Sequence, residues 1–130
     1  MLFRSTVTAS LEVTATVLRN VRVREDVARA SAMRGYMNAT ELADYLVRKG
    51  VPFREAHDAV GRLVLRAIER GVELQELELR EMKTLSPLVE DDVYEALSLE
   101  QTLATKSQTG GTAPERVRDA IRAARASLNE

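Results

Sequence analysis

Residues 36–71 constrain the fold most, because they read as two helices joined by a short turn. Asn38 or Thr40 is suited to cap the first helix, and Glu41 lies three residues after Asn38 as a capping-box partner. The apolar residues that follow recur at helical spacing and share one face: Leu42, Tyr45 and Leu46.

The turn and the second helix carry equally clear signals. Gly50 suits the left-handed position after a helix, and Pro52 prevents the first helix from continuing. Gly71 is placed to end the second helix. The apolar positions between them repeat every 3.6 residues: Phe53, Ala56, Val60, Leu63, Val64, Ala67 and Ile68. The sequence therefore predicts a helical hairpin.

Residues 4–20 fit two patterns. Val, Ala and Leu alternate there with Thr, Ser and Glu, which is typical of a strand. Read as a helix, the same residues form one stripe: Val7, Leu11, Thr14, Leu18 and Val21. The alternation is longer than the usual strand of about 5–6 residues, and no second strand exists to pair with it. We expect a helix.

Start and stop signals divide the remaining chain into short helices. Gly35 ends a helix over residues 25–34, residues 72–78 form a connector, and Ser86 with Pro87 stops a helix over residues 79–85. Three further helices are expected. The first begins at Asp91 or Asp92. The second begins at Ser98, with Gln101 as its capping-box partner, and runs to about Lys106; the third begins at Thr112, with Pro114 and Glu115 in its first turn, and runs to about Leu128. About seven or eight helices result, and the expected fold class is all-α.

Composition limits the functions that this chain can carry. It has 130 residues, with 19 Lys and Arg against 20 Asp and Glu, so the net charge of −1 gives no electrostatic reason to bind nucleic acid or an anionic membrane. It has no Cys, which excludes disulfides and thiolate sites. No apolar run reaches the ~20 residues of a membrane helix, and the N-terminal residues do not form a signal-peptide pattern.

His57 is the only histidine and the first candidate for acid–base chemistry. A general base needs an orienting partner and a cleft. The neighbouring acids Glu55 and Asp58 point to other faces of the helix. We therefore expect a partly buried structural histidine that donates one hydrogen bond.

Gly110, Gly111 and Thr112 precede a helix and could cradle an anion with free backbone N–H groups. The Lys and the longer glycine spacing of a phosphate-binding loop are missing. We expect a flexible joint followed by a helix cap, and we assign no ligand to it.

Arg62, Arg66 and Arg70 form a cationic stripe on the second helix of the hairpin. Such a helix resembles the reading helix of a helix-turn-helix DNA-binding protein. Glu55, Asp58 and Glu69 dilute the charge, and phosphate binding needs several uncompensated cations, so a solvated face is expected.

The acidic cluster of Glu90, Asp91 and Asp92 could bind a cation, but its spacing matches no calcium loop or two-metal site. A negatively charged helix start explains it more simply.

Gly61, inside a strong helix, costs about 1 kcal/mol relative to Ala, which a close helix–helix approach would justify. No catalytic, cofactor-binding or metal-binding residue is assigned.

Three runs in order resemble the C-terminal domain of argininosuccinate lyase, a family of the fumarase/aspartase superfamily. They are TELADYLVRKGVPFREAHDAVGRLV at residues 40–64, LSPLVEDDVYEALS at residues 85–98 and GGTAPERV at residues 110–117, and an Ala/Arg-rich final helix follows. The resemblance covers essentially the whole chain. The superfamily's catalytic motifs, Thr-Ala-x-x-x-His and Gly-Ser-Ser-x-Met-Pro-x-Lys-x-Asn, have no counterpart here.

The resemblance implies an organisation and a role. Residues 1–21 would be the end of a long central-bundle helix, and residues 22–130 a compact multi-helix C-terminal domain. The complete enzyme, a cytoplasmic homotetramer of arginine biosynthesis, cleaves argininosuccinate to arginine and fumarate without cofactor or metal. The part matched here would contribute packing surface to the rest of the lyase chain and to other subunits through helix 4–20. We expect the 130-residue chain to be inactive alone, and to be either cut from a longer protein or encoded by a shorter frame.

Two alternatives from other classes stay open. The apolar stripe of residues 4–20 could belong to an autonomous protein-interaction module. The arginine stripe could belong to a helix-turn-helix DNA binder.

Overall fold

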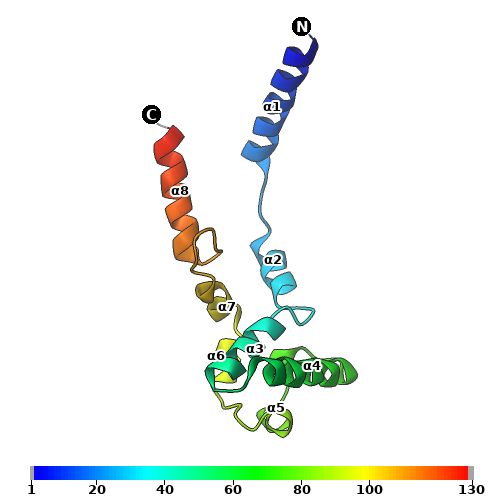
Figure 1. Cartoon of the computed structure of the whole chain (residues 1–130). Coiled ribbons are helices and arrows are strands. Elements are labelled where there is room, and N and C mark those ends of the chain that lie inside the picture. The colour runs from blue at the N-terminus through cyan, green and yellow to red at the C-terminus, as the bar shows by residue number, and fades with distance from the viewer. Residues whose placement is uncertain (1, 129–130) are drawn as a thin grey trace. The chain divides into compact units, whose positions relative to one another are not determined.

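The computed structural model describes residues 2–128, with side chains from Arg4 onward. Over this range the chain forms eight α-helices and one 3-10 helix, without a strand, which confirms the all-α class (Figure 1). The elements are α1 (Leu2–Asn20), α2 (Glu25–Ala32), α3 (Ala39–Arg48), α4 (Phe53–Arg70), η1 (Leu74–Glu76), α5 (Leu79–Leu85), α6 (Val93–Ala96), α7 (Leu99–Thr105) and α8 (Pro114–Leu128).

The chain divides into two compact units, one ending at Ser31 and the other beginning at Ala32. The first unit contains α1, so the helical interpretation of residues 4–20 is confirmed. Its threonines fit a helix because Thr8, Thr14 and Thr16 each donate their hydroxyl to the carbonyl oxygen four residues earlier, at 2.8–2.9 Å. Its larger apolar side chains are all exposed within the described chain: Val7, Leu11, Val13, Val17 and Leu18.

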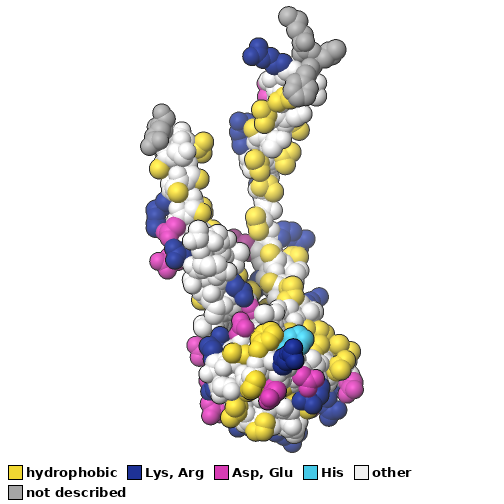
Figure 2. Space-filling model, viewed as in Figure 1, with side chains coloured by type: hydrophobic (Ala, Val, Ile, Leu, Met, Phe, Trp, Pro, Cys, Tyr) yellow, Lys and Arg dark blue, Asp and Glu magenta, His cyan; other side chains and the backbone are white. Residues whose placement is uncertain are grey.

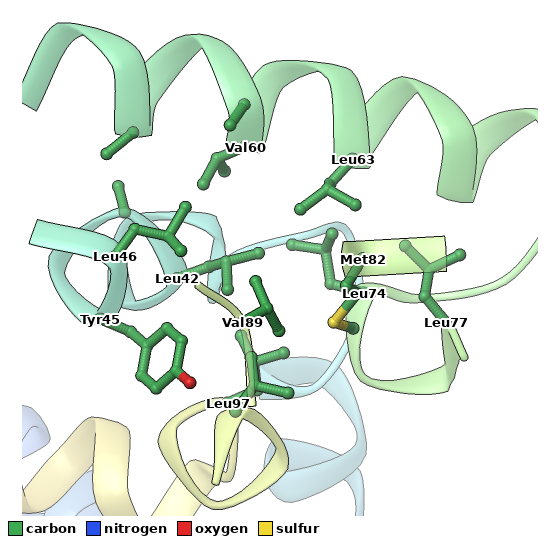
Figure 3. Close-up of a cluster of buried hydrophobic side chains, with 14 of the residues drawn as sticks. Leu42, Tyr45, Leu46, Val60, Leu63, Leu74, Leu77, Met82, Val89 and Leu97 are labelled. Carbon is green, nitrogen blue, oxygen red and sulfur yellow. The ribbon is translucent and has the colours of Figure 1, made fainter. Parts of the chain in front are cut away.

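The second unit holds the hydrophobic core, which is built on the hairpin of α3 and α4. Val60 and Leu63 of α4 point toward Leu42 and Leu46 of α3, as the sequence pattern predicts (Figure 3). The segments from η1 to α6 close the core from the other side with these buried residues: Leu74, Leu77, Met82, Val89, Val93 and Leu97.

The two glycines expected to end the hairpin helices do so. Gly50 and Gly71 have φ angles of +95° and +65°. After α3, the Gly50 N–H donates to Val47 at 2.9 Å and the Val51 N–H donates to Leu46 at 3.0 Å. This paired arrangement is the Schellman motif, and the equivalent bonds after α4 run from Gly71 and Val72.

The expected capping box at the start of α3 is wrong. Asn38 occupies the N-cap position, but its side chain makes no capping bond. Its amide instead donates to Gln75 Oε1 at 3.0 Å and to the Leu97 carbonyl at 3.2 Å. Glu41 instead pairs with Lys106 at 2.6 Å. Contacts with distant segments therefore outcompete the local cap.

The other predicted boundaries are close to those observed. Ser98 caps α7, because its Oγ accepts the Gln101 N–H at 3.2 Å. Helix α8 begins at Pro114, and the Ala113 carbonyl accepts its first bond from Val117, so the cap lies one residue after Thr112. The predicted connector 72–78 contains η1, which the sequence analysis missed.

Candidate functional site

An apolar groove between α3 and α4 is the candidate surface that holds the only histidine. Its volume is about 300 Å³, and its polar lining residues are Thr40, Asp44 and His57. The other lining residues are apolar or small: Ala39, Ala43, Phe53, Val60, Gly61, Val64 and Leu65. Figure 2 shows the histidine beside hydrophobic side chains on this face.

His57 does not have the partners of a general base. It is exposed, which contradicts the expectation of a partly buried residue. Its ring lies 6.2 Å from the Phe53 ring, tilted by 40°. Within the described part of the chain its ring makes no hydrogen bond or ion pair, so the expected donor bond is absent too. Nothing in this groove orients the imidazole for proton transfer.

The acidic cluster is used in a tertiary connection. Asp92 accepts the Tyr45 hydroxyl at 2.5 Å and pairs with Lys49 at 2.9 Å. Lys49 also pairs with Glu90, whose backbone N–H donates to the Tyr45 oxygen at 3.0 Å. We call Tyr45, Lys49, Glu90 and Asp92 the tyrosine cluster. It ties α3 to the segment before α6, and no group of three acidic or histidine residues suited to a metal ion occurs among residues 2–128.

Electrostatics within the tyrosine cluster follow from its geometry. The hydrogen bond from Tyr45 and then the ammonium of Lys49 lower the pKa of Asp92 below its ordinary value. Burial, and then the hydrogen bond to Asp92, raise the pKa of Tyr45 above 10.0. The bonds to Glu90 and Asp92 raise the pKa of Lys49. All three shifts favour the protonation states present at neutral pH.

The arginine stripe is neutralised by carboxylates. Arg62 pairs with Asp58 at 3.3 Å, and Arg66 lies 3.5 Å from Glu69. Arg70 pairs with Glu81 of α5, which also lies 3.7 Å from Arg66. The face carries no surplus of positive charge for phosphate contacts.

The glycine loop before α8 is closed on itself. A side chain on Gly111 would place its Cβ 2.0 Å from the Lys106 carbonyl oxygen. The Gly111 N–H donates to Gln108 at 2.8 Å, and the Ala113 N–H donates to Lys106 at 3.1 Å. These N–H groups are therefore unavailable to an anion, and Gly111 is required by close packing.

Two features of the second unit were not found by sequence reasoning. Glu41 is only 7% exposed and joins α3 to Lys106, while its second oxygen is buried without a partner. Tyr36 has a φ of +57°, and Glu73 stabilises this turn by accepting the N–H groups of Gly35 and Tyr36 at 3.1 and 3.2 Å. Both depend on residues more than 35 positions away along the chain.

None of the described helices is long and apolar enough to span a bilayer.

Comparison with known proteins identifies close relatives. Argininosuccinate lyase of Janthinobacterium sp. (strain Marseille) is 47% identical over 124 residues, covering 95% of this chain and 27% of that protein. The enzyme of Thioalkalivibrio sulfidiphilus is 49% identical over 123 residues, covering 95% of this chain and 26% of that protein. The chain therefore spans about a quarter of the length of these curated relatives.

Solved structures and a family profile agree with these relatives. A crystal structure of EDDS lyase in complex with formate matches with a TM-score of 0.70 and 32% identity, covering 78% of this chain and 22% of that chain. The profile described as argininosuccinate lyase C-terminal matches residues 36–104, from the turn before α3 through most of α7. The chain belongs to the argininosuccinate lyase C-terminal family.

Proposed function

We propose that this chain acts as the C-terminal domain of an argininosuccinate lyase, whose complete form cleaves argininosuccinate to arginine and fumarate. The observation that carries the proposal is the family match over residues 36–104. Relatives that are themselves argininosuccinate lyases extend the likeness to 95% of the chain. We therefore propose the activity, the substrate and the cytoplasmic location on the basis of this sequence likeness.

The role proposed for this chain within the enzyme is structural. No counterpart of the superfamily's catalytic motifs occurs in its sequence. His57 lacks an orienting partner among residues 2–128. A reaction centre needs a base and its orienting partner in one place, so the chemistry is assigned to the remaining three quarters of the lyase.

Helix α1 supports an assembly role, with residues 1–21 as a bundle helix and residues 22–130 as the C-terminal domain. Leu11 and Leu18 are 65% and 67% exposed on one stripe, and Val13 is 64% exposed on another face. A helix that is apolar on more than one face is stable when other helices surround it. We propose that the rest of the lyase chain and further subunits of a homotetramer cover these faces.

An activity assay tests the catalytic part of the proposal. The purified 130-residue chain should release no fumarate from argininosuccinate, as followed by ultraviolet absorbance. Mixing it with the upstream part of the Janthinobacterium enzyme, cut before the matched region, should restore release. Turnover by the 130-residue chain alone would show that it contains a reaction centre and would end the structural interpretation.

Charge substitutions in α1 test the assembly part. Leu11→Asp with Leu18→Asp should abolish the restored activity, because aspartates on an apolar stripe oppose burial between helices. Ser10→Asp with Thr16→Asp adds the same charge at polar positions of the same helix and serves as the matched control. Equal losses in both pairs would show that charge, and not the apolar stripe, is responsible.

The DNA-binding alternative receives no support from the ion pairs of Arg62, Arg66 and Arg70. We expect duplex DNA not to retard the protein at moderate salt. Retardation that weakens steeply with salt would revive that alternative.

A further inference from the structure

Residues 33–38, here called the entry turn, precede α3 at the start of the second unit. Tyr36 in this turn has a φ of +57°, which residues with a side chain rarely adopt because the Cβ atom then crowds the backbone. Gly35 before it has a φ of +75°, which glycine adopts freely. A tyrosine in the left-handed conformation costs free energy and persists only where surrounding contacts hold it there.

The Tyr36 side chain has packing roles that glycine could not fill. Its ring is partly buried and packs against the hydrophobic core of the second unit. Its hydroxyl donates to the Val72 carbonyl at 3.2 Å. These contacts hold the side chain in place, but they do not offset the strain in the Tyr36 backbone. Stabilisation of the backbone has to come from another residue.

Glu73 provides this stabilisation. Its Oε1 accepts the Gly35 N–H at 3.1 Å, and its Oε2 accepts the Tyr36 N–H at 3.2 Å. Two successive backbone N–H groups in a turn form a nest that favours an anion, and the carboxylate is that anion. Hydrogen bonds to a charged acceptor are stronger than those between neutral groups. The Glu73 backbone is fixed in turn, because its N–H donates to Glu76 Oε2 at 2.7 Å.

Gln75 adds neutral hydrogen bonds on both sides of this nest. Its amide donates to the Met33 carbonyl at 3.2 Å and accepts from the Asn38 amide at 3.0 Å. Neither bond reaches the N–H groups of the left-handed pair. We propose that Glu73 is the positioning residue of the entry turn: its carboxylate holds Gly35 and Tyr36 in the left-handed conformation and thereby fixes the course of the chain where it enters the second unit.

A consequence for assembly follows, and it rests on the proposed lyase function. Residues 1–21, proposed as a bundle helix, are joined to the second unit by the chain that leads into the entry turn. A flexible turn would have to be ordered when the lyase assembles, which costs conformational entropy. Glu73 lowers this cost because it orders the turn beforehand. We therefore expect Glu73 to favour assembly without contacting the substrate.

Hydrogen exchange measured by NMR tests the role of Glu73 in the 130-residue chain itself. In Glu73→Ala, the Gly35 and Tyr36 N–H groups should exchange at least about tenfold faster, because each loses a bond to a charged acceptor. The N–H of Leu63, whose side chain is fully buried in the core, should change by less than about twofold. Glu55→Ala is the charge control, since the Glu55 side chain makes no hydrogen bond or ion pair with other described residues. It should leave all three N–H groups unchanged.

Acetate gives a readout that a general loss of stability would not produce. Glu73→Ala vacates the nest, so added acetate should slow the exchange of the Gly35 and Tyr36 N–H groups again. Chloride at the same ionic strength controls for charge screening. Glu73→Gln keeps the volume of the side chain in the nest and should not respond to acetate. Faster exchange that extends equally to Leu63, or equal effects of acetate and chloride, would overturn the proposal.

Fumarate release separates this inference from the proposed function. Mixed with the upstream part of the Janthinobacterium enzyme, the Glu73→Ala chain should require at least about a threefold higher concentration than the wild-type chain for half-maximal release. Equal concentrations for the two chains would refute the role in assembly. If the wild-type chain restores no release, the proposed lyase function fails, whereas the exchange and acetate measurements still decide the role of Glu73 in the entry turn.

Discussion

At the scale of single residues, the Tyr45 hydroxyl connects segments 47 positions apart in the sequence. It donates to Asp92 at 2.5 Å and accepts the Glu90 N–H at 3.0 Å, while Tyr45 as a whole is only 4% exposed. Lys49 lies above the same ring, with Nζ 5.4 Å from the ring centre. This one side chain thus combines core packing with the attachment of the segment before α6.

Removing the Tyr45 hydroxyl should destabilise the folded chain. We expect Tyr45→Phe to lower the free energy of unfolding by about 1–3 kcal/mol, because it leaves the Glu90 N–H without its partner. Urea unfolding followed by circular dichroism measures the change. Tyr94→Phe is the matched control, since it removes a single bond, 2.9 Å long, to the Leu77 carbonyl. An equal or larger loss in the control would contradict the importance given to the tyrosine cluster.

Asp92 should make stability depend on pH at the acidic end. Its pKa in the folded chain lies below the ordinary 3.8, chiefly because of the Tyr45 hydrogen bond and then Lys49. The folded state therefore binds this proton less readily than the unfolded state. The resulting stability is present above pH 3.8 and is lost as the pH falls through the lower, folded-state pKa.

Thermal melts between about pH 2.5 and 6 measure this dependence, over the range in which carboxylates titrate. Asp92→Asn should flatten the acidic fall in melting temperature. Asp91→Asn changes the adjacent carboxylate, whose side chain makes no hydrogen bond or ion pair with other described residues, and should leave the fall unchanged. If the acidic fall in melting temperature flattened equally in both variants, the effect would come from the loss of any one negative charge and not from Asp92 in particular.

At the scale of elements, glycines at the end and in the middle of α4 have opposite roles. Gly71 has a left-handed φ of +65°, whereas Gly61 is helical with open space at its Cβ position. We expect Gly71→Ala to destabilise the chain by about 1 kcal/mol. Gly61→Ala should stabilise the monomer by up to about 1 kcal/mol. Urea unfolding at a low protein concentration gives the midpoint of each of the two variants. Midpoints that move in the same direction in both variants would refute this distinction.

Local signals predicted the elements well where a residue acts on its immediate neighbours. Gly50, Gly71 and Pro114 mark helix ends and starts by backbone geometry alone, and the structure places them as expected. Prediction failed where a side chain has a distant competitor. Asn38 bonds Gln75 and Leu97, and Glu41 bonds Lys106, so neither joins the expected local cap.

The candidate site shows the same limit. The sequence places His57 on the edge of an apolar face, and it lies in the groove of α3 and α4. Its exposure was not predictable, because Phe53 and Ile68 look like core residues in the periodic pattern but are 63% and 53% exposed. The periodic pattern indicates that a helix face is apolar, but it does not indicate which element or chain covers that face.

At the scale of the whole molecule, all residues identified as buried lie in the second unit. The first buried position is Glu41 and the last is Ala113, whereas α1 and α2 bury none of their described side chains. Stability should therefore reside in the unit that begins at Ala32. The segment at residues 21–24 between α1 and α2 is non-helical and exposed, and it contains Arg22 and Arg24.

Brief trypsin treatment should therefore cut first at Arg22 or Arg24, because proteases cleave exposed irregular backbone faster than helices. Mass spectrometry identifies the cut. The product starting at residue 23 or 25 should melt within a few degrees of the intact chain, since it keeps every buried residue. Arg22→Ser with Arg24→Ser should slow the first cut. A first cut in the hairpin at Arg48 or Lys49 would contradict the prediction that residues 21–24 are the most accessible site. A product that melts far lower than the intact chain would show that α1 stabilises the core.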